Sequence, residues 1–170
     1  MTTLLLSRGD YSIRPGIFDE PFNAQLLSQF RAAKSLGDVK KTHFFKGRYE
    51  NIYIDERHAP LLGKLKADAK TRASEIIRRP VDNFGCWFNA MGPGADTTLH
   101  SHDDDDELLS AVYYVRVPKN SGNLLIHSDK EVVQLTPREG QWVFFAPQTP
   151  HAVSENMSDE LRLSVAFNFS

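Results

Sequence analysis

The feature that most constrains the fold is a succession of short β-type runs that fills the chain from Phe84 onward. The runs are 84–91, 109–117, 123–127, 131–135, 141–146, 150–155 and 161–169. Turn-forming residues separate them, as in Gly92-Pro93-Gly94 and the segment from Pro118 to Gly122. Short strands punctuated in this way predict a β-sandwich or a barrel-like jelly roll.

The first half of the chain carries two helical patterns with extended segments near 42–54 between them. Asp19 is a candidate N-cap with Pro21 in the first turn, and a second helix begins near Pro60 and ends before Pro80. Each pattern places apolar residues on one face, at Phe22, Leu26, Phe30 and Ala33 and at Leu61, Leu65, Ala69, Ala73 and Ile76. The chain thus predicts an α+β, mainly β, domain over 1–170, in which 1–83 supports a double-stranded β-helix core over 84–170 and its helices pack on one sheet.

Composition narrows the possible partners and compartments. Apolar residues make up 41% and charged residues 25% of the 170 residues, and the net charge of -2 gives no electrostatic reason to expect nucleic acid or an anionic membrane as a partner. No stretch approaches the roughly 20 apolar residues of a membrane span. The single Cys86 has no partner for an internal disulfide, so a cytoplasmic location is the simplest interpretation.

The last β run alternates strictly between apolar and polar side chains. One face carries Leu161, Leu163, Val165, Phe167 and Phe169, and the other carries Arg162, Ser164, Ala166 and Asn168. Two interpretations follow from this alternation. Either the apolar face packs on the helices while the polar face looks into the barrel mouth, or the polar face is merely exposed to water.

A cluster of histidines and acidic residues points to a metal site. In the extended segment 100–104, His100, His102 and Asp104 lie on one side, and His151 follows an apolar strand that can return to the same rim of a barrel. Two imidazoles and one carboxylate that leave coordination positions open are suited to Fe(II). A His-x-Asp tripeptide alone is usually a surface feature, so the distant histidine strengthens the prediction.

Part of this pattern resembles the cupins. Gly94, His100, His102 and Glu107 have the spacing of the first cupin motif. Gly140, Pro147, His151 and Asn156 partly match the second, although the Pro-to-His spacing is one residue short. This resemblance implies a metalloenzyme, an isomerase or a simple dioxygenase, that uses His100, His102, Glu107 and His151 without 2-oxoglutarate.

A broader resemblance is to a small bacterial and phage branch of the Fe(II)- and 2-oxoglutarate-dependent oxygenases. The matching segments are 87–89 (WFN), His102 with 109–115 (LSAVYYV), 118–124 (PKNSGNL), 140–147 (GQWVFFAP), His151 and 162–168 (RLSVAFN). The resemblance implies His102, Asp104 and His151 as iron ligands, with His100 as the alternative to Asp104. It also implies Fe(II), 2-oxoglutarate and O2 as cofactor and cosubstrates.

The same resemblance gives roles to residues away from the metal. Many enzymes of this superfamily hold the distal carboxylate of 2-oxoglutarate with an Arg-x-Ser pair, here Arg162 and Ser164, and a guanidinium fork matches a carboxylate bidentately. Tyr114 is expected to face the interior beside them, and Asn89 and Trp87 are candidates for the substrate pocket. The implied activity is hydroxylation of an unactivated carbon of a small molecule or a peptide side chain, with release of succinate and CO2.

Overall fold

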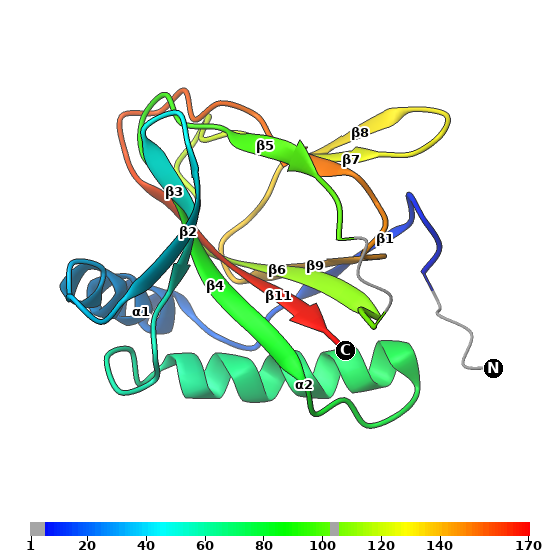
Figure 1. Cartoon of the computed structure of the whole chain (residues 1–170), viewed down its shortest axis with the longest axis horizontal. Helices are drawn as coiled ribbons and strands as arrows, with labels where there is room; N and C mark the ends of the chain where they lie inside the picture. Colours follow the sequence, from blue (N-terminus) through cyan, green and yellow to red (C-terminus); the bar gives the residue numbers. More distant parts are fainter. Residues whose placement is uncertain (1–5, 103–105) are drawn as a thin grey trace.

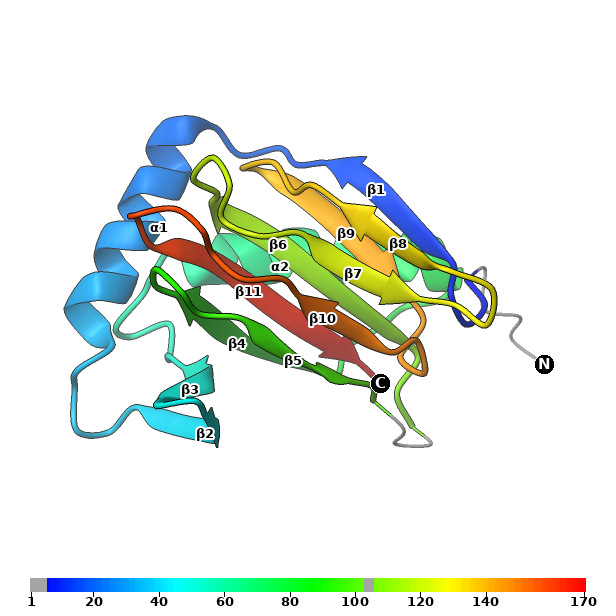
Figure 2. The same cartoon turned by 90° about the horizontal axis from the view of Figure 1, so that it is seen from above.

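Two antiparallel sheets stacked face to face form the body of the molecule in the computed structural model, which describes residues 6–102 and 106–170 (Figures 1 and 2). The larger sheet runs β1 (Tyr11–Pro15), β9 (Gln141–Phe145), β6 (Leu109–Arg116), β11 (Arg162–Phe169), β4 (Phe84–Met91), β3 (Arg48–Tyr53) and β2 (Lys40–Phe45). The smaller sheet runs β5 (Thr97–His100), β10 (His151–Val153), β7 (Leu124–His127) and β8 (Val132–Leu135). The predicted double-stranded β-helix is confirmed.

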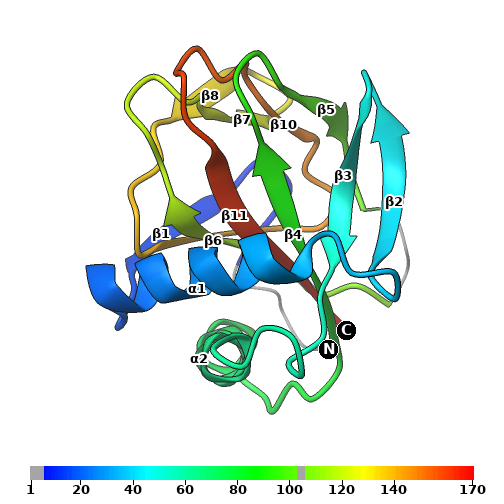
Figure 3. The same ribbon diagram turned by 90° about the vertical axis from the view of Figure 1, so that its left-hand side faces the viewer.

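Both predicted helices are present and cover the outer face of the larger sheet (Figure 3). The first, α1 (Glu20–Ala33), begins where Asp19 Oδ1 accepts a hydrogen bond from the Phe22 amide at 3.0 Å. The second, α2 (Leu62–Ile77), ends at Arg78, whose left-handed conformation breaks the helix. None of the helices in the described residues is long and apolar enough to cross a membrane.

Strand β11 separates the hydrophobic core from the interior of the barrel. Its apolar residues, from Leu163 to Phe169, join the core that Leu26, Phe30 and the α2 side chains complete. Its polar residues Arg162, Ser164 and Asn168 line a cavity between the sheets. The first of the two interpretations of this strand is therefore the observed one.

Two short strands, β1 and β5, were not predicted from the sequence. Strand β1 pairs with β9 along the edge of the larger sheet. Strand β5, with the sequence Thr-Thr-Leu-His, pairs with β10 and sets His100 opposite His151. Strand β1 is only five residues long and ends in Pro15, and β5 has no alternation of apolar residues, so both are weak signals in the sequence and are held by their pairing with β9 and β10.

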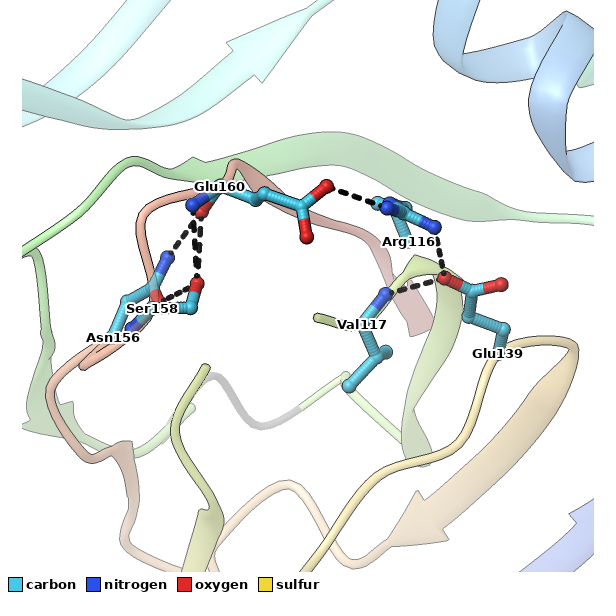
Figure 4. A network of polar contacts seen from close by, with 6 residues as sticks. All are labelled: Arg116, Val117, Glu139, Asn156, Ser158 and Glu160. Carbon is cyan, nitrogen blue, oxygen red and sulfur yellow. Dashed lines mark hydrogen bonds and ion pairs between the residues drawn. The ribbon is translucent and has the colours of Figure 1, made fainter. Parts of the chain in front are cut away.

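A polar network fixes the loop that leads into β11 (Figure 4). Asn156, fully buried, donates from Nδ2 to the carbonyls of Met91 and Glu160, each at 2.9 Å, and its Oδ1 accepts from the Ser158 hydroxyl at 2.6 Å. Arg116 pairs with Glu160 at 2.6 Å from the neighbouring strand. Because Arg162 follows Glu160 by two residues, this network also sets where Arg162 enters the barrel.

Candidate active site

Three histidines converge at the mouth of the barrel. His100 ends β5, His151 begins β10, and His102 follows two residues after His100. One ring nitrogen from each lies within 4.8 Å of the others, and the His100 and His151 rings are 4.2 Å apart between centroids. The pairing of β5 with β10 produces this convergence, because it places His100 directly across from His151.

Backbone carbonyls hold two of the three imidazoles in a defined tautomer. His100 Nδ1 lies 2.7 Å from the Thr98 carbonyl and His151 Nδ1 lies 2.9 Å from the Thr149 carbonyl. A carbonyl can only accept, so each Nδ1 carries the proton and each Nε2 keeps its lone pair. Ligand histidines in metal sites are usually oriented in this way.

Burial keeps the central imidazole neutral. His151 is 7% exposed, and burial lowers its pKa to about 3, with a further contribution from the neighbouring His100. A neutral imidazole is the form that coordinates a metal. The chemistry of this donor set fits Fe(II), which accepts imidazole nitrogen ligands readily.

The sequence offered two acidic residues, Asp104 and Glu107, as possible metal ligands. Asp104 lies outside the described residues. Glu107 lies beside the cluster, with Oε2 3.8 Å from His102 Nδ1, but it is not a member of the convergent group found among residues 6–102 and 106–170. Within that part of the chain, the structure brings His100 together with His102 and His151.

Below the histidines, the cavity floor is a row of side chains that crosses the larger sheet. Ser164 on β11 pairs with Asn89 on β4 and with Tyr114 on β6, so the three side chains share one face. In the next row, Ala166 pairs with Trp87. All five residues line the cavity that also contains the histidine cluster.

Arg162 lies in the same cavity with only 2% of its surface exposed. Its Nη1 donates to the carbonyls of Gly122 at 2.7 Å and Ser121 at 3.3 Å. Within residues 6–102 and 106–170 it forms no ion pair with a carboxylate. A buried guanidinium without an acid partner is costly, and an anionic ligand would offset that cost.

The two adjacent tyrosines point in opposite directions. The Tyr113 hydroxyl donates to Asn23 Oδ1 on α1 at 2.7 Å and belongs to the helix side of the sheet. Tyr114 faces the cavity, and its buried hydroxyl has no hydrogen-bond partner among the described residues. Burial raises the pKa of Tyr114 while the nearby Arg162 opposes the shift. Its hydroxyl is thus a neutral donor beside Arg162.

The structure adds polar residues that the sequence had not placed. Arg48 on β3 donates to Asn89 Oδ1 and Thr97 Oγ1, both at 3.0 Å, and so ties the β2–β3 hairpin to the cavity wall. Asn168 Nδ2 lies 3.0 Å from His102 Nδ1. The alternation of β11 could have flagged Asn168, since it shares a face with Arg162 and Ser164.

An outer cleft opens the site to solvent. It shares Asn51, Trp87 and Asn168 with the inner cavity, as well as His100 and His102. The remaining wall includes Glu50, Tyr53 and Thr98 from strands β3 and β5. The histidine cluster therefore lies where a buried polar cavity meets an accessible cleft.

A double-stranded β-helix with convergent histidines at its mouth defines a class of non-haem metal-binding proteins. Within that class, the model of the 2OG-Fe(II) oxygenase superfamily matches residues 86–170. The chain belongs to this superfamily, and its cofactor and cosubstrate are Fe(II) and 2-oxoglutarate.

Solved structures share the fold at low identity. A prolyl-4-hydroxylase of Pseudomonas putida superposes with a TM-score of 0.73 at 22% identity, covering 96% of this chain and 93% of that one. The epimerase SnoN, in complex with Fe3+, alpha-ketoglutarate and nogalamycin RO, superposes with a TM-score of 0.72 at 16% identity and covers 94% of this chain and 78% of its own.

Part of a phage DNA polymerase is also similar to this chain in sequence. Over 165 residues the chain is 26% identical to the DNA-directed DNA polymerase of Escherichia phage T7, covering 83% of this chain and 23% of that protein. The chain therefore spans about a quarter of the length of that relative.

Proposed function

We propose that this protein is an Fe(II)- and 2-oxoglutarate-dependent hydroxylase whose iron binds His100, His102 and His151. The observation that carries the proposal is the pairing, in one cavity, of this cluster with the buried Arg162. Arg162, Ser164 and the Tyr114 hydroxyl then bind the distal carboxylate of 2-oxoglutarate. A guanidinium and two hydroxyls supply donors of the kind that recognise a buried carboxylate.

The ligand set has one open choice, between His100 and Asp104. His100 is favoured by its nitrogen within 4.8 Å of those of His102 and His151 and by its Nδ1 contact with Thr98. Asp104, expected from the motif His-x-Asp, takes its place in the alternative set. His102 and His151 are common to both sets.

The chemistry that Fe(II) and 2-oxoglutarate supply when bound is the activation of O2 coupled to conversion of 2-oxoglutarate to succinate and CO2. The protein's own residues hold and orient the reactants. His151, neutral and buried, offers a lone pair without losing a proton, and Arg162 fixes the far end of the cosubstrate. Apolar neighbours such as Ala166 and Phe145 keep water out of the cavity.

The substrate binds in the outer cleft, beside the histidines and opposite the cosubstrate, and an unactivated C–H bond becomes C–OH. The fold is shared with a prolyl-4-hydroxylase and with SnoN in complex with nogalamycin RO, which supports proposing either a prolyl-type side chain or a small molecule as the substrate. Trp87 lines both the cavity and this cleft, and Asn89 lines the cavity next to Ser164, so both are placed to contribute to the substrate pocket.

The test is binding of 2-oxoglutarate to metal-loaded protein, measured by calorimetry without oxygen, together with succinate formation in oxygen. We expect saturable binding, and Arg162→Ala should weaken it by about 100-fold or more, since a buried charge-assisted pair is lost. Arg31→Ala, at an exposed position on α1, is the matched control and should bind normally. Absence of saturable binding by the wild type, or an Arg162→Ala variant that binds normally, would overturn the proposal.

A further inference from the structure

Glu107 stands next to the metal cluster without belonging to it. Its side chain is 15% exposed, and its Oε2 lies 3.8 Å from His102 Nδ1. Its other oxygen, Oε1, accepts a hydrogen bond from Asn168 Nδ2 at 3.1 Å. The same amide nitrogen lies 3.0 Å from His102 Nδ1, so the three side chains form one connected group.

The environment of His102 differs from that of the other two histidines. The Nδ1 atoms of His100 and His151 each face a backbone carbonyl, which is a neutral acceptor. His102 Nδ1 faces an amide NH2 group, with a carboxylate just beyond it. The amide is fixed in this orientation because its Oδ1 accepts from the Ser110 hydroxyl at 3.0 Å while its Nδ2 contacts Glu107.

The contact between Asn168 Nδ2 and His102 Nδ1 bears on the tautomer of the His102 ring. An amide N–H that points at Nδ1 requires a lone pair there, and the ring proton is then on Nε2. Coordination through Nε2 requires the opposite tautomer, with the proton on Nδ1. An NH2 group cannot accept that proton, whereas Glu107 Oε2, a carboxylate oxygen 3.8 Å from Nδ1, can.

We propose that Glu107 is a positioning residue that accepts the Nδ1 proton of His102 in a hydrogen bond and so directs Nε2 of this ring to the metal. The ring proton moves from Nε2 to Nδ1, and no proton leaves the protein. Carboxylate–histidine–metal arrangements of this kind raise the basicity of the ligand.

The inference rests on the proposed function only in taking His102 as a metal ligand, and His102 is a ligand in both sets considered above. It assigns Glu107 a role that differs from direct coordination, as in the cupin arrangement. The two roles predict opposite changes in metal affinity when the carboxylate is moved from position 107 to position 168. Asn168 allows this, because its amide already lies within hydrogen-bond distance of Nδ1.

The experiment measures Co(II) affinity by chelator competition and records the Co(II) absorption spectrum, so no turnover is needed. We expect Glu107→Gln to weaken Co(II) binding by about 10–100-fold and to shift the spectrum. The double variant Glu107→Gln/Asn168→Asp should recover most of the affinity, because it returns a carboxylate to Nδ1. Asp106→Asn, at the adjacent exposed position, is the control and should bind as the wild type does.

Two results would overturn the inference. One is a Glu107→Gln variant with wild-type affinity and spectrum. The other is a weakened single variant that the added Asn168→Asp change fails to rescue although circular dichroism shows the double variant folded, which would assign Glu107 a direct or purely structural role. Failure of the proposed function has a separate signature, since wild-type protein would then bind Co(II) with the same dependence on Glu107 but show no saturable binding of 2-oxoglutarate.

Discussion

His100 and His151 lie directly opposite each other on the paired strands β5 and β10, with their ring centroids 4.2 Å apart. Each ring is held by a hydrogen bond from Nδ1 to the carbonyl of the residue two positions earlier. The two imidazoles are therefore positioned by the sheet itself, before any metal binds. A site built on paired strands needs little reorganisation to accept a ligand.

The first prediction separates the two ligand sets. His100→Ala should lower the Co(II) or Fe(II) affinity by more than about 100-fold, since loss of a direct ligand exceeds the effect of an outer partner. Asp104→Asn should have a small effect. Chelator competition measures both, with His127→Ala, on β7, as the control. A large loss with Asp104→Asn and none with His100→Ala would establish the carboxylate set instead.

Asn156 should be among the residues that contribute most to stability outside the apolar core. Its buried amide donates to two carbonyls and accepts from Ser158, so Asn156→Ala leaves several buried groups unsatisfied. We expect a loss of about 2–4 kcal/mol in the free energy of unfolding, measured with urea. Ser158→Ala, which removes one partner at a more exposed position, should cost about 1 kcal/mol. Equal costs for the two variants would contradict this account.

Gly122 should be intolerant of a side chain for two reasons. Its φ is +102°, and a Cβ would clash with the Ser154 carbonyl oxygen and lie 3.2 Å from Arg162 Nη1. Gly122→Ala should cost about 1–3 kcal/mol in stability through backbone strain alone, and also weaken binding of 2-oxoglutarate by moving Arg162. Gly47→Ala is the matched control, because Gly47 also has a positive φ but no atom within 4 Å of a Cβ. It should lose stability without losing cosubstrate affinity.

The buried hydroxyl of Tyr113 should make the free energy of unfolding depend on pH in the alkaline range. Burial raises its pKa to about 12, above the ordinary value of 10, so the folded state keeps a proton that the unfolded state loses. This contribution to stability is fully present below pH 10 and is lost as pH rises from 10 to 12, by about 2–3 kcal/mol. Tyr113→Phe should reduce this loss while costing about 1 kcal/mol at pH 8 through the missing bond to Asn23. Identical alkaline profiles for the two proteins would refute the prediction.

The sequence predicts most of the fold because its strands and helices carry strong local patterns. Strand β4 matches its predicted range, 84–91, and α1 begins at the predicted cap, Asp19. The alternation along β11 divides its side chains into two faces but leaves open which face looks into the barrel, whereas the inward direction of Tyr114 was predicted and is observed. Strand β5 was missed because its four residues carry no apolar alternation and are held by the pairing with β10.

The metal site was less predictable than the fold, for a physical reason. The resemblance implies His102 and Asp104 as ligands, but Asp104 lies outside the described residues, so the choice between Asp104 and His100 stays a prediction. Pairing across the sheet does fix position, and it sets His100 opposite His151. Interactions between distant side chains, such as Asn168 with His102, have no local signature in the sequence.

The proposed contacts for the iron and for the far carboxylate of 2-oxoglutarate come from different layers of the sandwich. His100 and His151 belong to the smaller sheet, whereas Tyr114, Ser164 and Arg162 belong to the larger one. A cosubstrate that chelates the metal at one end and binds Arg162 at the other would connect the two sheets. Bound 2-oxoglutarate would then be expected to raise the free energy of unfolding, because it would connect the two sheets only in the folded protein.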